Sequence, residues 1–271
     1  MHITFIGGGN MASALAGGLL QRGWQARQIR IVEVDAAARE RIARQFGVDV
    51  TGSAQVAGSD VVVLAVKPQQ LREAAAALAP DLREQLVVSI AAGVRVADLA
   101  RWLGGYARIV RAMPNTPALV HAGVTGLYAP AGVSAGERQS AEDILGAVGR
   151  TLWVADEAQI DAVTAVSGSG PAYVFYFIEA LEQAAAELGF DASEARLLAL
   201  ETFHGAVLLA RSGTDDPATL RRRVTSKGGT TERAVRELDA AAVRTGIVAA
   251  VRAACERSRE LGDELGRAGD A

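Results

Sequence analysis

The sequence predicts an α/β fold, in which a doubly wound parallel sheet is followed by an all-helical C-terminal region. Apolar strand-like runs alternate with helical stretches in the first half, as is typical of a parallel sheet covered by helices on both faces. These runs stop after about residue 155. A chain of 271 residues, 50% of them hydrophobic, also has the size at which one core tends to divide into two. We therefore expect two domains, residues 1–157 and 158–271.

The expected strands are short runs rich in Val, Ile and Leu, and their near-continuous apolar character fits burial on both sides of the sheet. Helix-like stretches, such as 35–46 and 69–79, lie between them. The strands are expected at residues 2–6, 29–34, 61–66, 86–91 and 107–113.

The second half contains helix signals only. Pro171 stands in a first-turn position of a long helix that closes at Gly189, and a second helix follows over residues 193–213. Pro217 opens a short helix, and residues 231–261 supply at least one more. These helices are apolar over wide faces, more than one layer of a monomer would need. We therefore expect them to pack against a partner subunit and to form a dimerisation domain.

Composition and charge exclude several classes of function. The net charge is −3 and acidic and basic residues are interspersed, so no basic stripe is offered to nucleic acid. Cys255 is the single cysteine and cannot form an intrachain disulfide. The N-terminus does not resemble a secretory leader, and no apolar run has membrane-spanning length. We expect a cytoplasmic protein that binds neither nucleic acid nor membrane.

The stretch "FIGGGNMA" predicts a dinucleotide-binding turn. Gly7, Gly9 and Ala12 have the spacing GxGxxA between the first strand and the first helix. Gly7 permits the tight turn, Gly9 lets the backbone approach a pyrophosphate, and Ala12 allows close packing of helix on strand. The free N–H groups at the helix start favour a phosphate. This context indicates a Rossmann-type domain that binds NADPH or NADH.

The choice between these cofactors stays open in the sequence. Glu33, at the end of the second strand, is expected to accept hydrogen bonds from the adenosine ribose and so favours NAD over NADP. Arg39 and Arg41 lie just downstream, where either guanidinium could face a 2′-phosphate.

Further strand ends are expected to line the same cleft, because open α/β sheets bind ligands beyond the carboxyl ends of their strands. Lys67 suits a backbone-shaped turn better than a catalytic role, and Asn115 is a candidate for hydrogen bonding near the nicotinamide or for capping a turn. The expected cofactor-binding residues are Ile6, Gly7, Gly8, Gly9, Asn10, Met11, Glu33, Ala65, Val66, Lys67, Pro68, Ala91, Ala92, Gly93 and Asn115.

The stretch "TSKGGTTERAV" predicts a second anion site. Gly228 and Gly229 permit unusual backbone angles, and Thr230 and Thr231 begin a helix with free N–H groups and hydroxyls. The phosphate-loop pattern is absent and no strand precedes this turn, so a small carboxylate is the better ligand. The alternative is a glycine turn that starts a helix and binds nothing. "SGSGPAYVF" (167–175) offers a similar choice, for which packing is the default.

The stretches "FIGGGNMA", "AVKPQ", "VVSIAAGV", "IVRAMPNTPA", "VSGSGPAY" and "TSKGGTTERAV", in this order, resemble Δ1-pyrroline-5-carboxylate reductases over residues 3–260. The resemblance implies NAD(P)H-dependent hydride transfer to the C=N carbon of the cyclic imine, giving L-proline. It also implies a homodimer with interlocking helical domains, with a decamer as the larger alternative. Family members often have proline where this chain has Lys227. The implied substrate-binding residues are Ser226, Gly228, Gly229, Thr230 and Thr231.

The same resemblance suggests that Thr231 orients the substrate at its ring nitrogen. No His/Asp dyad or metal-binding cluster is evident, and reduction of a protonated imine needs chiefly positioning. A keto or hydroxy acid reductase of similar architecture is one alternative, but the helices over 161–210 contain no lysine and only His204 as proton donors of the usual kind. A non-catalytic dinucleotide sensor and a helical scaffold with a vestigial cofactor fold are the others.

Overall fold

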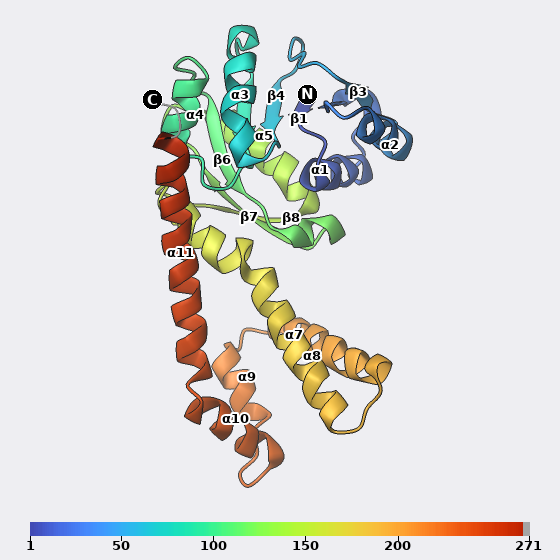
Figure 1. Cartoon of the computed structure of the whole chain (residues 1–271), viewed down its shortest axis with the longest axis vertical. Coiled ribbons are helices and arrows are strands. Elements are labelled where there is room, and N and C mark those ends of the chain that lie inside the picture. The colour runs from blue at the N-terminus through green and yellow to red at the C-terminus, as the bar shows by residue number, and fades with distance from the viewer. Residues whose placement is uncertain (268–271) are drawn as a thin grey trace. The chain divides into compact units, whose positions relative to one another are not determined.

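The computed structural model describes residues 1–267 and confirms the predicted fold class (Figure 1). The chain divides into two compact units. One consists of residues 1–169 together with the C-terminal stretch from Ala254, and the other spans Gly170–Ala253. Within the described part of the chain, none of the helices is both long enough and apolar enough to cross a membrane.

The first unit is built on an eight-stranded sheet in the order β3-β2-β1-β4-β5-β6-β7-β8. Neighbouring strands are parallel except β6 and β7, which are antiparallel. The chain reverses its direction of progress across the sheet between β1 and β4, which is where open α/β sheets bind dinucleotides. The strands are β1 (Ile3–Ile6), β2 (Ile29–Val32), β3 (Asp49–Thr51), β4 (Val61–Leu64), β5 (Leu86–Ser89), β6 (Ile109–Met113), β7 (Gly123–Tyr128) and β8 (Gly149–Trp153).

All of the expected strands are present, and each is shorter than predicted. The expected run 29–34, for example, ends as a strand at Val32. Strands β3, β7 and β8 were not predicted. β3 is three residues long, and β7 and β8 contain glycines and half-exposed positions instead of a continuous apolar run. Such strands are stabilised by hydrogen bonds to a neighbouring strand. A local sequence pattern does not show that this neighbour will be present.

Side chains of the inner strands alternate between two buried layers. In β4, Val61 and Val63 join the layer that includes helices α1 (Asn10–Gln21), α2 (Ala36–Phe46) and α5 (Ala135–Leu145). Val62 and Leu64 join the layer beneath α3 (Pro68–Leu78) and α4 (Val96–Trp102). Full burial of such a side chain contributes about 1.5–3 kcal/mol, so the sheet is fixed from both faces. Short turns of 3-10 helix are Ala26–Gln28, Ala79–Asp81, Thr116–Val120 and Gly146–Val148.

Two of the helices after residue 158 begin at an aspartate whose side chain caps them. Asp191 accepts hydrogen bonds from the N–H groups of Ser193 and Glu194, and Asp216 accepts one from Thr219. Pro171 lies in the first turn of its helix, as predicted. The elements are α6 (Gln159–Val163), a π-helical turn (Thr164–Gly168), α7 (Gly170–Glu187), α8 (Ala192–Ser212), α9 (Pro217–Arg223), α10 (Thr230–Ala240) and α11 (Val243–Arg267).

The end of α11 packs on the sheet unit, which the sequence pattern did not indicate. The Ser258 hydroxyl donates to Oδ1 of Asp161 over 2.8 Å, and both residues are buried. A Cβ atom at Gly262 would lie 3.1 Å from the carbonyl oxygen of Gly93, so the helix approaches that loop closely. Arg95 adds an ion pair to Asp263 at 2.7 Å. The predicted domain that runs from 158 to 271 thus includes a stretch that packs with the first unit, and its residues 268–271 lie outside the described residues.

Candidate active site

The predicted dinucleotide turn lies at the carboxyl end of β1. Gly7 has φ +103°, a value that side-chain-bearing residues rarely adopt, and its N–H donates to the carbonyl of Val32 over 2.8 Å. A Cβ atom there would lie 2.9 Å from the carbonyl oxygen of Ala65. Gly7 is therefore required both by its backbone angle and by the close approach of the residue that follows β4.

Helix α1 begins at Asn10 with its N-terminus open. Its N-cap, Gly9, makes no side-chain cap, and a Cβ atom at Gly9 would have no heavy atom within 4 Å in the part of the chain that the structure describes. Ala12 is fully buried against the sheet. The unbonded N–H groups and the helix dipole favour an anion at this point. The residues present therefore fit the pyrophosphate of a dinucleotide.

Glu33 follows β2 and lies beside this turn. Its Oε2 accepts the N–H of Gly8 over 2.9 Å, and its Oε1 accepts the N–H of Asp35 over 3.0 Å. Arg39 donates Nη1 to the carbonyl oxygens of Glu33 and Val34, over 2.9 and 2.8 Å. The structure thus brings Glu33 and the glycine turn together, as the sequence predicted, and holds the carboxylate in place.

The other predicted cofactor residues follow neighbouring strands at the same edge of the sheet. Ala65 follows β4 and donates its N–H to the carbonyl of Ile6 over 2.8 Å. The exposed Lys67 is the N-cap of α3 and makes no side-chain cap. Gly93, beyond β5, has φ +79° and lies against α11. Contacts of these residues with a nicotinamide or ribose remain predictions.

Asn115 connects segments of the protein through both ends of its side chain. Nδ2 donates to the carbonyl of Ser167 over 3.0 Å, and Oδ1 accepts the N–H of Val124 over 2.8 Å. The amide therefore fixes the turn after β6 against β7 and the π-helical turn. Gly168 packs in the same region, where a Cβ atom would lie 2.7 Å from the methyl carbon of Met113.

The predicted substrate loop belongs to the helical unit and is shaped by local bonds. Gly228 has φ +75°, and the N–H of Gly229, the N-cap of α10, donates to the carbonyl of Ser226 over 3.1 Å. Thr230 and Thr231 form the first turn, and among residues 1–267 their hydroxyls make no hydrogen bond. The loop thus presents backbone N–H groups and hydroxyls, which suit a small carboxylate.

Glu232 also shapes the predicted substrate loop, although the sequence did not indicate this role. Its Oε2 accepts the N–H of Gly228 over 2.7 Å, closing the loop on the first turn of α10. The available signal was the acidic residue in the first turn of a predicted helix, which commonly reaches back to bond the chain before it. Residues 226–232 are consequently preformed as a compact turn.

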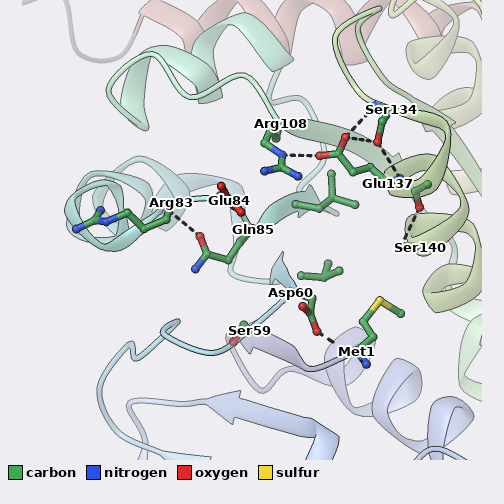
Figure 2. A pocket seen from close by; sticks show the side chains of 13 residues that line it. Met1, Ser59, Asp60, Arg83, Glu84, Gln85, Arg108, Ser134, Glu137 and Ser140 are labelled. Atoms are coloured by element: carbon green, nitrogen blue, oxygen red, sulfur yellow. Dashed lines mark hydrogen bonds and ion pairs between the residues drawn. The ribbon is translucent and has the colours of Figure 1, made fainter.

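A separate cavity of about 650 Å³ lies at the opposite edge of the sheet, where β4, β5 and β6 begin (Figure 2). None of the predicted site residues lines it. Four of its charged groups form two pairs, because Arg108 donates Nε to Glu137 over 2.6 Å and the Met1 ammonium lies 3.9 Å from Asp60. Burial raises the pKa of Glu137, but hydrogen bonds from Ser134 and Arg108 outweigh it and lower that pKa below its usual value.

Models of known families match both halves of the chain. Residues 2–93, which contain the glycine turn and Glu33, match the family described as NADP oxidoreductase, coenzyme F420-dependent. Residues 157–261, which contain the loop around Gly228, match the family described as pyrroline-5-carboxylate reductase dimerisation.

Full-length relatives are also found. The chain is 50% identical over 269 residues to a pyrroline-5-carboxylate reductase of Pseudomonas aeruginosa, which covers 98% of both chains. It is 44% identical to the corresponding protein of Haemophilus influenzae, over 96% of this chain and 97% of the relative.

Solved structures show the same fold. A pyrroline-5-carboxylate reductase from Coxiella burnetii matches with a TM-score of 0.91 at 42% identity, over 96% of this chain and 98% of the other. A pyrroline carboxylate reductase from Plasmodium falciparum with NADP bound matches with a TM-score of 0.87 at 28% identity, over 97% and 98%.

Proposed function

The chain belongs to the pyrroline-5-carboxylate reductase family, and we propose that it reduces Δ1-pyrroline-5-carboxylate to L-proline with NADPH or NADH. The observation that carries this proposal is the 50% identity to a reductase of that name over nearly the full length of both chains. The open N-terminus of α1 beside Gly9 supports it, because it suits a pyrophosphate.

When bound, the reduced nicotinamide supplies the hydride that adds to the C=N carbon. The chain's own part is to hold the reactants. Gly7–Met11 would bind the pyrophosphate and Glu33 the adenosine ribose, while the predicted residues after β4, β5 and β6 would border the nicotinamide end. Such positioning supplies much of the acceleration for an imine, which is already electrophilic when protonated.

The loop Ser226–Thr231 would hold the other reactant. Its backbone N–H groups suit the substrate carboxylate, and the hydroxyl of Thr231 would hydrogen-bond the ring nitrogen and orient the group that protonates it. The exposed Lys227 adds a positive charge that attracts an anionic substrate.

The chain forms a homo-oligomer through the region that matches the dimerisation family. Our proposal for its form is a homodimer, with a decamer as the larger assembly, in which the substrate loop of one subunit completes the cleft of another. Large apolar side chains exposed on α7 and α8, such as Phe175, Tyr176 and Leu197, support it. Light scattering during gel filtration measures the mass directly.

We also retain the functional division into a dinucleotide-binding domain, residues 1–157, and a helical substrate-binding and dimerisation domain, residues 158–271. The dimerisation family match, which begins at residue 157, supports it. A cytoplasmic location is part of the same proposal, and fractionation of the source cells tests it.

The deciding experiment follows NADPH and NADH oxidation separately in the presence of pyrroline-5-carboxylate. Consumption of either cofactor with formation of proline is the expected result. If neither is consumed although a dinucleotide binds, the proposed reaction is wrong, and a dinucleotide sensor and a keto or hydroxy acid reductase are the alternatives that stay.

A further inference from the structure

Glu33 follows β2, at the place where this fold puts the adenosine ribose of a bound dinucleotide. The 2′ carbon of that ribose has a hydroxyl group in NADH and a phosphate group in NADPH. β1 and β2 are parallel neighbours with Ile6 opposite Val32, so the residues that follow, Gly7 and Glu33, lie side by side. In a fold of this kind, the residue at the end of β2 faces the ribose hydroxyls.

The Glu33 carboxylate is held in position instead of being free to turn away. It accepts one hydrogen bond on each oxygen, from Gly8 at 2.9 Å and from Asp35 at 3.0 Å. A carboxylate has about four lone-pair sites, so each oxygen can accept another bond from a ribose hydroxyl. A 2′-phosphate would instead meet a fixed negative charge.

Residues 33–38 offer no cationic or hydroxyl side chain to a 2′-phosphate. The stretch "EVDAAA", residues 33–38, contains no serine, threonine, lysine or arginine. Asp35 caps α2 by accepting the N–H of Ala38 over 2.6 Å, so a carboxylate already occupies that helix start.

The two arginines downstream are a weaker source of donors for a 2′-phosphate. Arg39 turns Nη1 to two backbone carbonyls, and the same nitrogen lies 3.3 Å from the position of a Cβ atom on Gly52, so the guanidinium is held against the chain and keeps only Nε and Nη2 as further donors. Arg41 is exposed on α2, where solvent and salt weaken its attraction for a phosphate.

From this arrangement we propose that the protein binds NADH in preference to NADPH, and that the fixed carboxylate of Glu33 determines the preference. The inference rests on the proposed function, since it concerns the same dinucleotide site. It is a property of residues 33–39 of this chain, and a relative with NADP bound can differ there.

The test measures dissociation constants of NADH and NADPH for the full-length protein without imine, by calorimetry. We expect NADH to bind at least about tenfold more tightly, because like charges brought together in a binding site strongly disfavour the wrong partner. ADP-ribose and its 2′-phosphate, titrated in the same way, should show the same ratio, since the difference lies at the adenosine end.

Glu33→Ser removes the charge and supplies a hydroxyl donor, and Glu33→Gln removes the charge with little change of shape. Both variants should bind NADPH more tightly than the parent protein does. The ratio of the NADPH dissociation constant to the NADH dissociation constant should fall by about tenfold or more. Glu40→Gln is the matched control, because Glu40 is an exposed acid of α2 whose carboxylate pairs with Arg44 at 3.5 Å. The Glu40→Gln variant should have the same ratio of the two dissociation constants as the parent protein.

Equal or tighter binding of NADPH by the parent protein would overturn the preference while leaving the proposed function intact. An unchanged ratio in both Glu33 variants, with melting temperatures like the parent's, would also overturn it. If the parent protein binds neither dinucleotide, the proposed function is wrong as well.

Discussion

The two glycine-rich helix starts of this protein are built in different ways. Gly7 is enclosed by the sheet, with the carbonyl of Ala65 2.9 Å from the position of its missing Cβ atom. Gly228 has no heavy atom within 4 Å of that position anywhere in residues 1–267, and its N–H bonds only to Glu232, four residues away. The core therefore determines the first loop, whereas the second takes its shape from its own sequence.

This difference separates fold from ligand binding. A substitution in the first loop should lower the stability of the sheet unit, the affinity for the dinucleotide or both. The result depends on whether the new side chain points toward the sheet or toward the bound dinucleotide. In the second, truncation of a side chain such as that of Thr231 should leave the fold intact and affect the bound substrate alone.

Gly7→Ala is expected to have the largest effect. The added methyl group collides with the backbone of Ala65, directly after β4, and forces an alanine to φ +103°, at a combined cost of about 2–5 kcal/mol. Thermal unfolding should show a large loss of stability, and calorimetry should show no dinucleotide binding. A variant of normal stability would mean that β4 can move away from the turn.

Gly9→Ala should separate the two roles of the same loop. Gly9 has φ −69°, which alanine adopts without strain, and its Cβ position is open. The melting temperature should therefore match the parent's, while dinucleotide affinity falls about tenfold or more, because the methyl group displaces the pyrophosphate from the backbone. Unchanged affinity would place the pyrophosphate elsewhere.

Thr231→Ala is expected to lower kcat/KM for the imine by about ten- to hundredfold through the loss of orientation at the ring nitrogen. Dinucleotide affinity and melting temperature should stay close to those of the parent. Thr231→Ser keeps the hydroxyl and serves as the control. A Thr231→Ala enzyme with normal kcat/KM would remove this hydroxyl from the site.

Lys227→Ala should have the smallest effect. The side chain is exposed, and an exposed charge contributes about 0–1 kcal/mol, so KM for the anionic imine should rise by less than about fivefold. The rise should disappear at high salt, because salt screens the attraction. If the difference persists in high salt, Lys227 contacts the substrate directly.

Much of the fold could be predicted because its signals are local. The apolar run at 61–66 is long enough to indicate a buried strand, the spacing of Gly7, Gly9 and Ala12 indicates the turn that follows β1, and Asp191 marks a helix start. Each of these features depends on residues close together in the chain.

Other features depend on residues far apart. Arg111, placed in an apolar strand, is 3% exposed because Glu157 bonds it at 3.0 Å and Asp161 lies 3.5 Å away. The docking of α11 likewise needs Ser258 and Asp161 to meet across the unit. A helix pattern shows which face of α11 is apolar but not which surface that face will meet.

The sequence by itself determined the order of the five apolar strands and the helices between them, the glycine turn and the presence of an acid at position 33. Only the tertiary structure decided that the Glu33 carboxylate bonds to Gly8 and that Arg39 turns to backbone carbonyls. The physical reason is that backbone preferences act over a few residues, whereas the direction of a charged side chain depends on donors and acceptors that folding brings from elsewhere in the chain.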